Sequence, residues 1–134
     1  MKKQFTMLCL LVLTAITISS CKKDTESVKA RLIGKWTVNK IEVSGNMDET
    51  LNGTFSYSLN DYIDFKSNDD DQVELSLKNQ RTIGSYITSL GSEFSMVFPE
   101  GTSYCTINTL NASQLQFIAK IDKTNIVKVY YLSR

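Results

Sequence analysis

Apolar and polar side chains alternate along most of the chain after residue 34, in segments of six to ten residues separated by turn-forming residues. The segment 114–121 is the clearest example, because Leu115, Phe117, Ala119 and Ile121 fall on one face and polar side chains dominate the other. A period of two is typical of a β-strand that buries one face. The pattern therefore predicts an all-β domain over residues 34–134.

Turn residues divide this domain into eight predicted strands. They cover residues 36–43, 55–65, 73–77, 82–88, 93–98, 103–110, 114–121 and 125–133. In the first strand the apolar positions change from even to odd numbers near Asn39 and Lys40, which predicts a bulge or bend. The second strand is interrupted only at Asp61.

The connections between the predicted strands are mostly two to five residues long, so sequential neighbours should pair antiparallel. Eight such strands avoid open edges best by closing into an up-and-down barrel. In the last strand the two faces are equally apolar, and the sequence leaves open which one points inward. One face holds Ile126, Tyr130 and Leu132, and the other holds Val127, Val129 and Tyr131.

The chain begins differently, with Lys2 and Lys3 followed by twelve apolar or small residues from Met7 to Ile18. A membrane-spanning helix needs about 20 apolar residues, so this run is too short to cross a bilayer. A basic start, a short apolar run and small residues are typical of an export signal. We therefore expect residues 1–20 to be a signal peptide that is removed.

Composition narrows the function. The chain has 134 residues, 15 Lys and Arg, 14 Asp and Glu, and no His. This size suits one domain, and the near-neutral charge excludes a strongly basic nucleic-acid binder. Without His the commonest general base and imidazole metal ligand are missing, and no phosphate loop, nucleophile elbow or CxxC motif is present. The sequence predicts no catalytic residues, no metal site and no cofactor, so we expect a protein that is not an enzyme.

The residues that end the apolar run, Ile18-Ser19-Ser20-Cys21, resemble the bacterial lipoprotein box. The resemblance implies that Cys21 is acylated and that the exported protein is tethered to a membrane by lipid, favouring the outer membrane with the leaflet left open. Residues 21–33 are then the lipidated cysteine, a polar tether and a short helical turn. Ser27 or Thr25 could cap this turn, which should end at Gly34.

The domain itself opens with Gly34 and Trp36 and finishes on Arg134. Gly-x-Trp with a late basic residue resembles the lipocalin superfamily, and the whole arrangement is most similar to the lipocalin-like lipoproteins of Bacteroidetes. The resemblance implies an eight-stranded lipocalin-like barrel with Trp36 at its closed base and Arg134 stacked over the indole. The Thr-Asp-Tyr motif of secreted lipocalins is absent, which weakens an inference of transport.

An eight-stranded barrel can be filled by side chains or can hold one small ligand. The bulky candidates for lining an apolar ligand pocket are Phe55, Tyr57, Phe65, Phe94, Phe98, Tyr104 and Phe117. The first hypothesis is non-catalytic binding of a small apolar or amphipathic molecule. The alternative is a filled barrel that serves as a structural or interaction module, contacting an envelope protein through the loop from Ser44 to Thr54.

Overall fold

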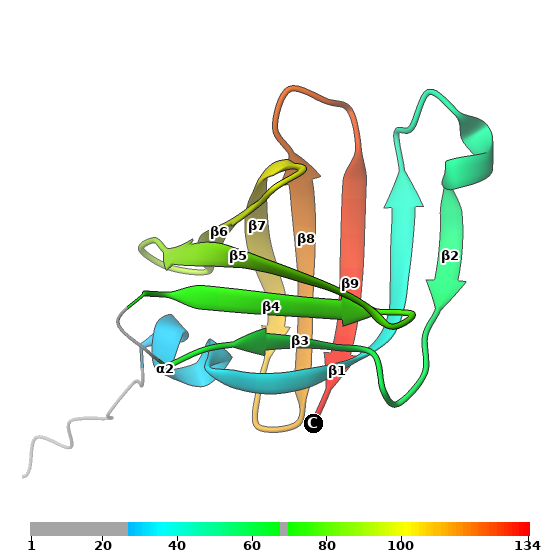
Figure 1. Ribbon diagram of the computed structural model, residues 1–134. Helices are drawn as coiled ribbons and strands as arrows, with labels where there is room; N and C mark the ends of the chain where they lie inside the picture. The colour runs from blue at the N-terminus through cyan, green and yellow to red at the C-terminus, as the bar shows by residue number, and fades with distance from the viewer. Residues whose placement is uncertain (1–26, 68–69) are drawn as a thin grey trace, which may run out of the picture.

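The computed structural model describes residues 27–67 and 70–134 (Figure 1). The predicted signal peptide and Cys21 lie outside the described residues. In chain order the elements are α2 (Val28–Leu32), β1 (Gly34–Ser44), the 3₁₀ turn η2 (Glu49–Leu51), β2 (Gly53–Ser56), β3 (Tyr62–Phe65), β4 (Gln72–Leu77), β5 (Gln80–Thr88), β6 (Glu93–Phe98), β7 (Gly101–Leu110), β8 (Gln114–Ile121) and β9 (Val127–Ser133).

Eight of these strands form the closed antiparallel barrel that the sequence predicts. From β3 to β9 each strand pairs with the next along the chain, and β1 joins the two ends by pairing with both β3 and β9. In Figure 1 the red strand β9 lies beside the cyan β1. The closed ring leaves neither β1 nor β9 with an unpaired edge along the barrel wall.

The predicted second strand, residues 55–65, is split in two in the structure. β2 pairs with the C-terminal half of β1 and β3 with its N-terminal half, so both lie along the same edge of β1. Asp61 ends the extended run, since its carboxylate accepts the Ser58 N–H at 2.7 Å and the Ser58 hydroxyl at 3.0 Å. This local turn replaces ladder hydrogen bonds, and it leaves β2 as a ninth strand among the described residues.

The bulge predicted in the first strand is confirmed. The pairing of β1 with β9 shifts register between Val38 and Lys40. Trp36 and Val38 are buried before the shift and Ile41 after it, so apolar side chains at even and then odd positions all face the interior. The extra residue bends β1 and lets one long strand follow the curved wall.

The helical turn is also as expected. The Ser27 hydroxyl accepts the Ala30 N–H at 3.2 Å, which caps the first turn of α2. Leu32 in the last turn is fully buried, and it ties α2 to one end of the barrel. The opposite end holds the turns between β4 and β5, β6 and β7, and β8 and β9, and we call it the mouth (Figure 1).

Candidate functional site

The end of the barrel beside α2 is closed by Trp36 and Arg134. The indole is fully buried and its Nε1 donates a hydrogen bond to the Leu32 carbonyl at 2.8 Å. The Arg134 guanidinium lies over the ring with its Cζ 3.9 Å from the centroid, and it donates to the carbonyls of Ile33 and Ala112 at 3.0 and 3.1 Å. The stack predicted from the sequence is therefore present, and it seals the base.

Gly34 allows this stack to form. Its φ of +116° lies in a region that side chains other than glycine rarely adopt, and a Cβ there would be 3.2 Å from Arg134 Nη1. A positive φ and the close approach of Arg134 therefore both favour glycine at position 34. Gly34 and Trp36 thus act as one structural unit with Arg134.

Above the base, a row of five aromatic rings crosses the interior. Tyr86 meets Phe65 edge-on at a centroid distance of 5.1 Å, and Phe65 meets Phe94 at 5.9 Å. Phe94 meets Phe117 at 5.1 Å, and Phe117 stacks nearly parallel on Tyr130 at 4.7 Å and 14°. All five rings are at most 5% exposed. This row fills the lower part of the barrel.

Between the row and the mouth there is an open cavity of about 330 Å³, which we call the mouth pocket. This volume lies at the lower end of the range for small-molecule sites. Its apolar lining comes from β4, β6, β8 and β9, and consists of Leu75, Leu77, Met96, Phe98, Ile121 and Tyr130. Its polar lining, with the small Gly101, consists of Gln80, Thr82, Glu100, Ser103 and Lys128.

The polar groups of the pocket have few partners within the barrel. Among residues 27–67 and 70–134, the side chains of Glu100 and Lys128 make no ion pair, and the Tyr130 hydroxyl makes no hydrogen bond. Burial raises the pKa of Tyr130, with Cys105, Tyr57 and the Glu100 carboxylate acting in the same direction. The phenol therefore stays protonated and can donate a hydrogen bond to a ligand.

Of the seven aromatic residues predicted to line a pocket, Phe98 does so. Phe65, Phe94 and Phe117 belong to the aromatic row, where the alternative of core packing holds. Tyr104 is 56% exposed, so its prediction as a lining residue was wrong. The neighbouring Cys105 takes the inward position of β7, and alternation turns Tyr104 outward.

Phe55 and Tyr57 are half-buried and do not line the mouth pocket. Phe55 lies opposite Ile41 on β2, outside the closed ring. Tyr57 follows β2, where its N–H donates to the Asn39 carbonyl of β1 at 3.0 Å and its side chain packs against the edge of the core. The split of the predicted strand at Asp61 therefore accounts for the displacement of both residues from the pocket.

Sequence reasoning missed the contribution of β9. Tyr130 and Leu132 are buried, so the even positions of this strand face inward and Lys128 points into the barrel with them. Since both faces of β9 are apolar, alternation alone could not choose between them. Lys128 shares the parity of Tyr130 and Leu132, and because lysine is seldom buried, its presence favoured the opposite face of the strand.

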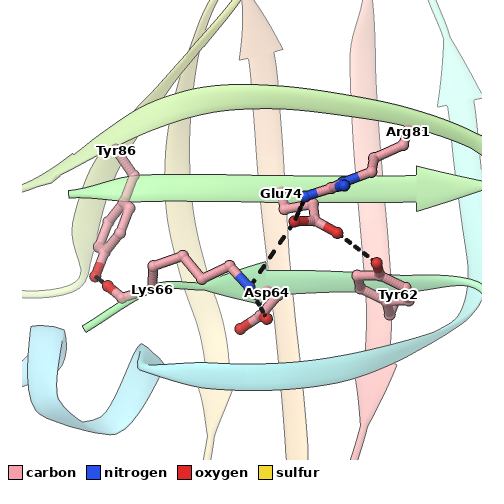
Figure 2. A network of polar contacts seen from close by, with 6 residues as sticks. All are labelled: Tyr62, Asp64, Lys66, Glu74, Arg81 and Tyr86. Carbon is pink, nitrogen blue, oxygen red and sulfur yellow. Dashed lines mark hydrogen bonds and ion pairs between the residues drawn. The ribbon is translucent and has the colours of Figure 1, made fainter. Parts of the chain in front are cut away.

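A second polar cluster lies on the outer wall, across β3, β4 and β5 (Figure 2). The Glu74 carboxylate, only 6% exposed, accepts hydrogen bonds from the Tyr62 hydroxyl and from Arg81, the latter at 2.7 Å. Lys66 lies between the carboxylates, 2.5 Å from Asp64 and 3.8 Å from Glu74. Lys35 of β1 extends the cluster by lying over the Tyr62 ring at 4.0 Å.

The pairing of β3 with β4 places Asp64 directly opposite Glu74. Sequence spacing did not indicate this proximity. The hydrogen bond from Tyr62, with Arg81 and Lys66 nearby, lowers the pKa of Glu74 below its ordinary value, although burial opposes the shift. The Glu74 carboxylate is thus ionised, and basic side chains already bind both carboxylates. This arrangement is suited to holding three strands together.

The single thiol of the domain is equally enclosed. Cys105 is 2% exposed, and burial raises the pKa of the thiol to about 12. In the described part of the chain, no group of three or more His, Cys, Asp or Glu side chains is placed to hold a metal ion. Neither α2 nor any other helix of that part has the length and apolar character needed to cross a membrane.

The fold and the pocket together define a closed, eight-stranded, lipocalin-like β-barrel with one sealed and one open end. Comparison with known proteins adds no family to this description. No protein-family model matches the chain, and no curated protein is significantly similar to it.

Proposed function

We propose that this protein is a lipid-anchored lipoprotein of the bacterial envelope whose barrel binds a small apolar or amphipathic molecule without transforming it. The observation that carries the proposal is the mouth pocket, an open cavity of about 330 Å³ with an apolar floor above a tightly packed aromatic row. Sites for small molecules are typically concave, mostly apolar and equipped with a few polar groups.

The absence of catalysis is part of the proposal. The chain has no His, and the buried Cys105 thiol is a poor nucleophile because only the thiolate reacts. The carboxylates Asp64 and Glu74 lie on the outer wall, away from the pocket, and are engaged by basic residues. These features favour a protein that holds a ligand.

Titration with an apolar fluorescent probe and native mass spectrometry of the protein released from membranes test the binding function. We expect one probe per barrel and a retained molecule. Leu77→Trp, which fills the pocket from β4, should abolish binding, whereas Ile87→Trp should not, since Ile87 is 63% exposed on the outer wall. Failure of the wild-type protein to retain a molecule or bind the probe stoichiometrically would refute the proposal.

Anchoring is proposed from the sequence, with an outer-membrane location. One acyl chain binds a bilayer only marginally, whereas two or more hold a protein stably. We predict that Cys21→Ala abolishes both partition into a detergent phase and incorporation of labelled palmitate. Cys105→Ala is the matched control, because this buried cysteine should leave both readouts unchanged. Continued partition of the Cys21 variant would contradict the anchor.

A second candidate function, contact with another envelope protein, is favoured by exposed apolar side chains on the loop between β1 and β2. Met47 is 95% exposed and Leu51 is 53% exposed. The loop is ordered by Asp48, which caps η2, and by reciprocal hydrogen bonds between Asn46 and Asn52. Replacing Met47 and Leu51 with serine should abolish co-purification of a partner without unfolding the barrel. Unchanged co-purification would count against this function.

A further inference from the structure

The mouth pocket contains a lysine that points inward. In β9 the inward positions are 128, 130 and 132, and Lys128 pairs with the buried Ala119 of β8 on one side. On the other side it pairs with Val43 of β1, which packs against the core. Lys128 is itself half-buried, two positions nearer the mouth than Tyr130. Its ammonium group therefore belongs to the pocket wall.

This ammonium group has no counter-ion within the described part of the molecule. No Asp or Glu carboxylate there lies within 4.0 Å of Lys128 Nζ, although Glu100 lines the same pocket. A partly desolvated, unpaired charge is unfavourable, and an anion that pairs with it removes that cost. Lys128 therefore offers an anion a better partner than a solvated surface lysine would.

Glu100 is a negative charge that would repel an anionic ligand, but its position makes its effect on the ligand weaker than that of Lys128. It is exposed in the turn between β6 and β7, whereas Lys128 is half-buried on the strand. Water screens an exposed charge strongly, and the interactions of a partly buried one are larger. The net effect on a ligand at the mouth is attraction of an anion.

We propose that the ligand is an amphipathic anion, whose carboxylate or phosphate head group pairs with Lys128 at the mouth. This inference rests on the proposed binding function. The apolar part of the ligand lies against Leu75, Leu77 and Met96, above the aromatic row.

Calorimetric titration with decanoate and with the uncharged decanol separates this inference from the general function. We expect both to bind the wild-type protein, and decanoate to bind tighter. Lys128→Met should lower the affinity for decanoate by about 10- to 100-fold, which is the effect expected for losing a hydrogen bond to a charged group. The same substitution should change the affinity for decanol by no more than about 2-fold, because methionine keeps the apolar bulk of the pocket wall.

Three further variants sharpen the test. Lys128→Arg should retain decanoate binding, which shows that charge at this position is what matters. Lys120→Met, at an exposed position on β8, should change the affinity for neither ligand. Glu100→Gln should leave decanoate binding unchanged or tighter, because it removes a like charge. Circular dichroism and denaturant unfolding verify that each variant is folded.

The outcomes distinguish the two proposals. If neither decanol nor decanoate binds, the binding function itself is wrong. If both bind and Lys128→Met changes them equally or not at all, the anionic head group is wrong while the pocket stands. A weaker affinity of the Glu100→Gln variant for decanoate would also overturn the head-group assignment.

The anion could come from a free amphiphile or from a membrane lipid. Incubation with vesicles of phosphatidylglycerol, followed by native mass spectrometry, distinguishes these sources. Lipid carried by the wild-type protein but not by Lys128→Met supports a membrane source, and binding of decanoate alone with the same dependence supports a free one. Lipid carried equally by both proteins would contradict the role of Lys128.

Discussion

Arg134 shows how much a single residue can hold in place. Its side chain covers the Trp36 ring and reaches main-chain carbonyls on both sides of the base, at Ile33 and at Ala112. These contacts join the segment after α2, the turn between β7 and β8, and the end of β9. A planar guanidinium can stack and donate several hydrogen bonds at once, which an ammonium group cannot.

We predict that Arg134→Met lowers the free energy of unfolding by about 1–2 kcal/mol, the sum of an exposed cation–π contact and lost hydrogen bonds. Arg134→Lys should recover only part of this loss. Denaturant unfolding of the two variants against the wild-type protein measures both effects. Full recovery with lysine would show that charge alone, and not the planar fork, stabilises the base.

Gly84 is a second position where the size of one residue determines how its neighbours pack. A Cβ there would lie 2.2 Å from the Val97 carbonyl oxygen and 2.7 Å from Cδ1 of Phe98. Since the first of these atoms is backbone, β5 and β6 would have to separate. Gly84 thereby leaves room for the Phe98 ring, which lines the mouth pocket.

Gly84→Ala should therefore cost about 1–3 kcal/mol, as overpacking usually does, and should also weaken apolar-probe binding by displacing Phe98. Ser85→Ala, the adjacent outward position, is the control and should change neither quantity appreciably. Thermal unfolding and probe titration report the two effects. An unaltered probe affinity in a folded Gly84→Ala protein would show that Phe98 does not shape the pocket.

At the scale of elements, alternation predicted most strands because most of them have one apolar and one polar face, as β8 does. It failed where tertiary contacts decided the outcome. Asp61 ends an otherwise regular run by binding both Ser58 and, at 2.6 Å, the N–H of Lys78 in the turn between β4 and β5. That second partner lies 17 positions away, so no local pattern could indicate it.

The outer polar cluster ties β3, β4 and β5 together in a way that depends on pH. Because the folded-state pKa of Glu74 is lowered, its contribution to stability is complete above its ordinary pKa of 4.5 and is lost as the pH falls through the folded-state value. The hydrogen bond from the Tyr62 hydroxyl is the largest cause of this shift.

Tyr62→Phe should accordingly reduce the free energy of unfolding by about 1 kcal/mol at about pH 7. The difference from the wild-type protein should shrink as the pH falls through the lowered folded-state pKa of Glu74, because protonation removes the charged acceptor. Denaturant unfolding at neutral and acid pH tests the prediction, with Tyr104→Phe, at an exposed position of β7, as the control. A difference that stays constant with pH would mean that Tyr62 acts through packing alone.

At the scale of the whole molecule, the barrel is neither filled nor hollow. The sequence supplied the aromatic residues but could not divide them between core and pocket, because that division depends on their depth along the barrel axis. Phe94 and Phe117 pack edge to face in one row with Phe65, whereas Phe98 lies two inward positions further along β6, toward the mouth. Depth follows from strand stagger, which a single sequence does not reveal.

The aromatic row sets the floor of the mouth pocket, so removing a ring should deepen it. Phe117→Ala is expected to lower the free energy of unfolding by about 3–5 kcal/mol and to shift the preferred ligand toward longer alkyl chains. Ile118→Ala, at the adjacent outward position on β8, should cost less and leave chain-length preference unchanged. Equal costs for the two substitutions would contradict the buried row.

The pairing of β1 with β9 also governs how the chain reaches its fold. Asn39 and Ser133, which share a hydrogen bond across this seam, are 94 positions apart. Contacts between residues so distant along the chain require a large loss of chain entropy before the contact forms, and they are associated with slow folding. The ring can close only after almost the entire domain has been synthesised. Until then the first strand has one edge open, and the interior that will become the pocket is exposed to other chains.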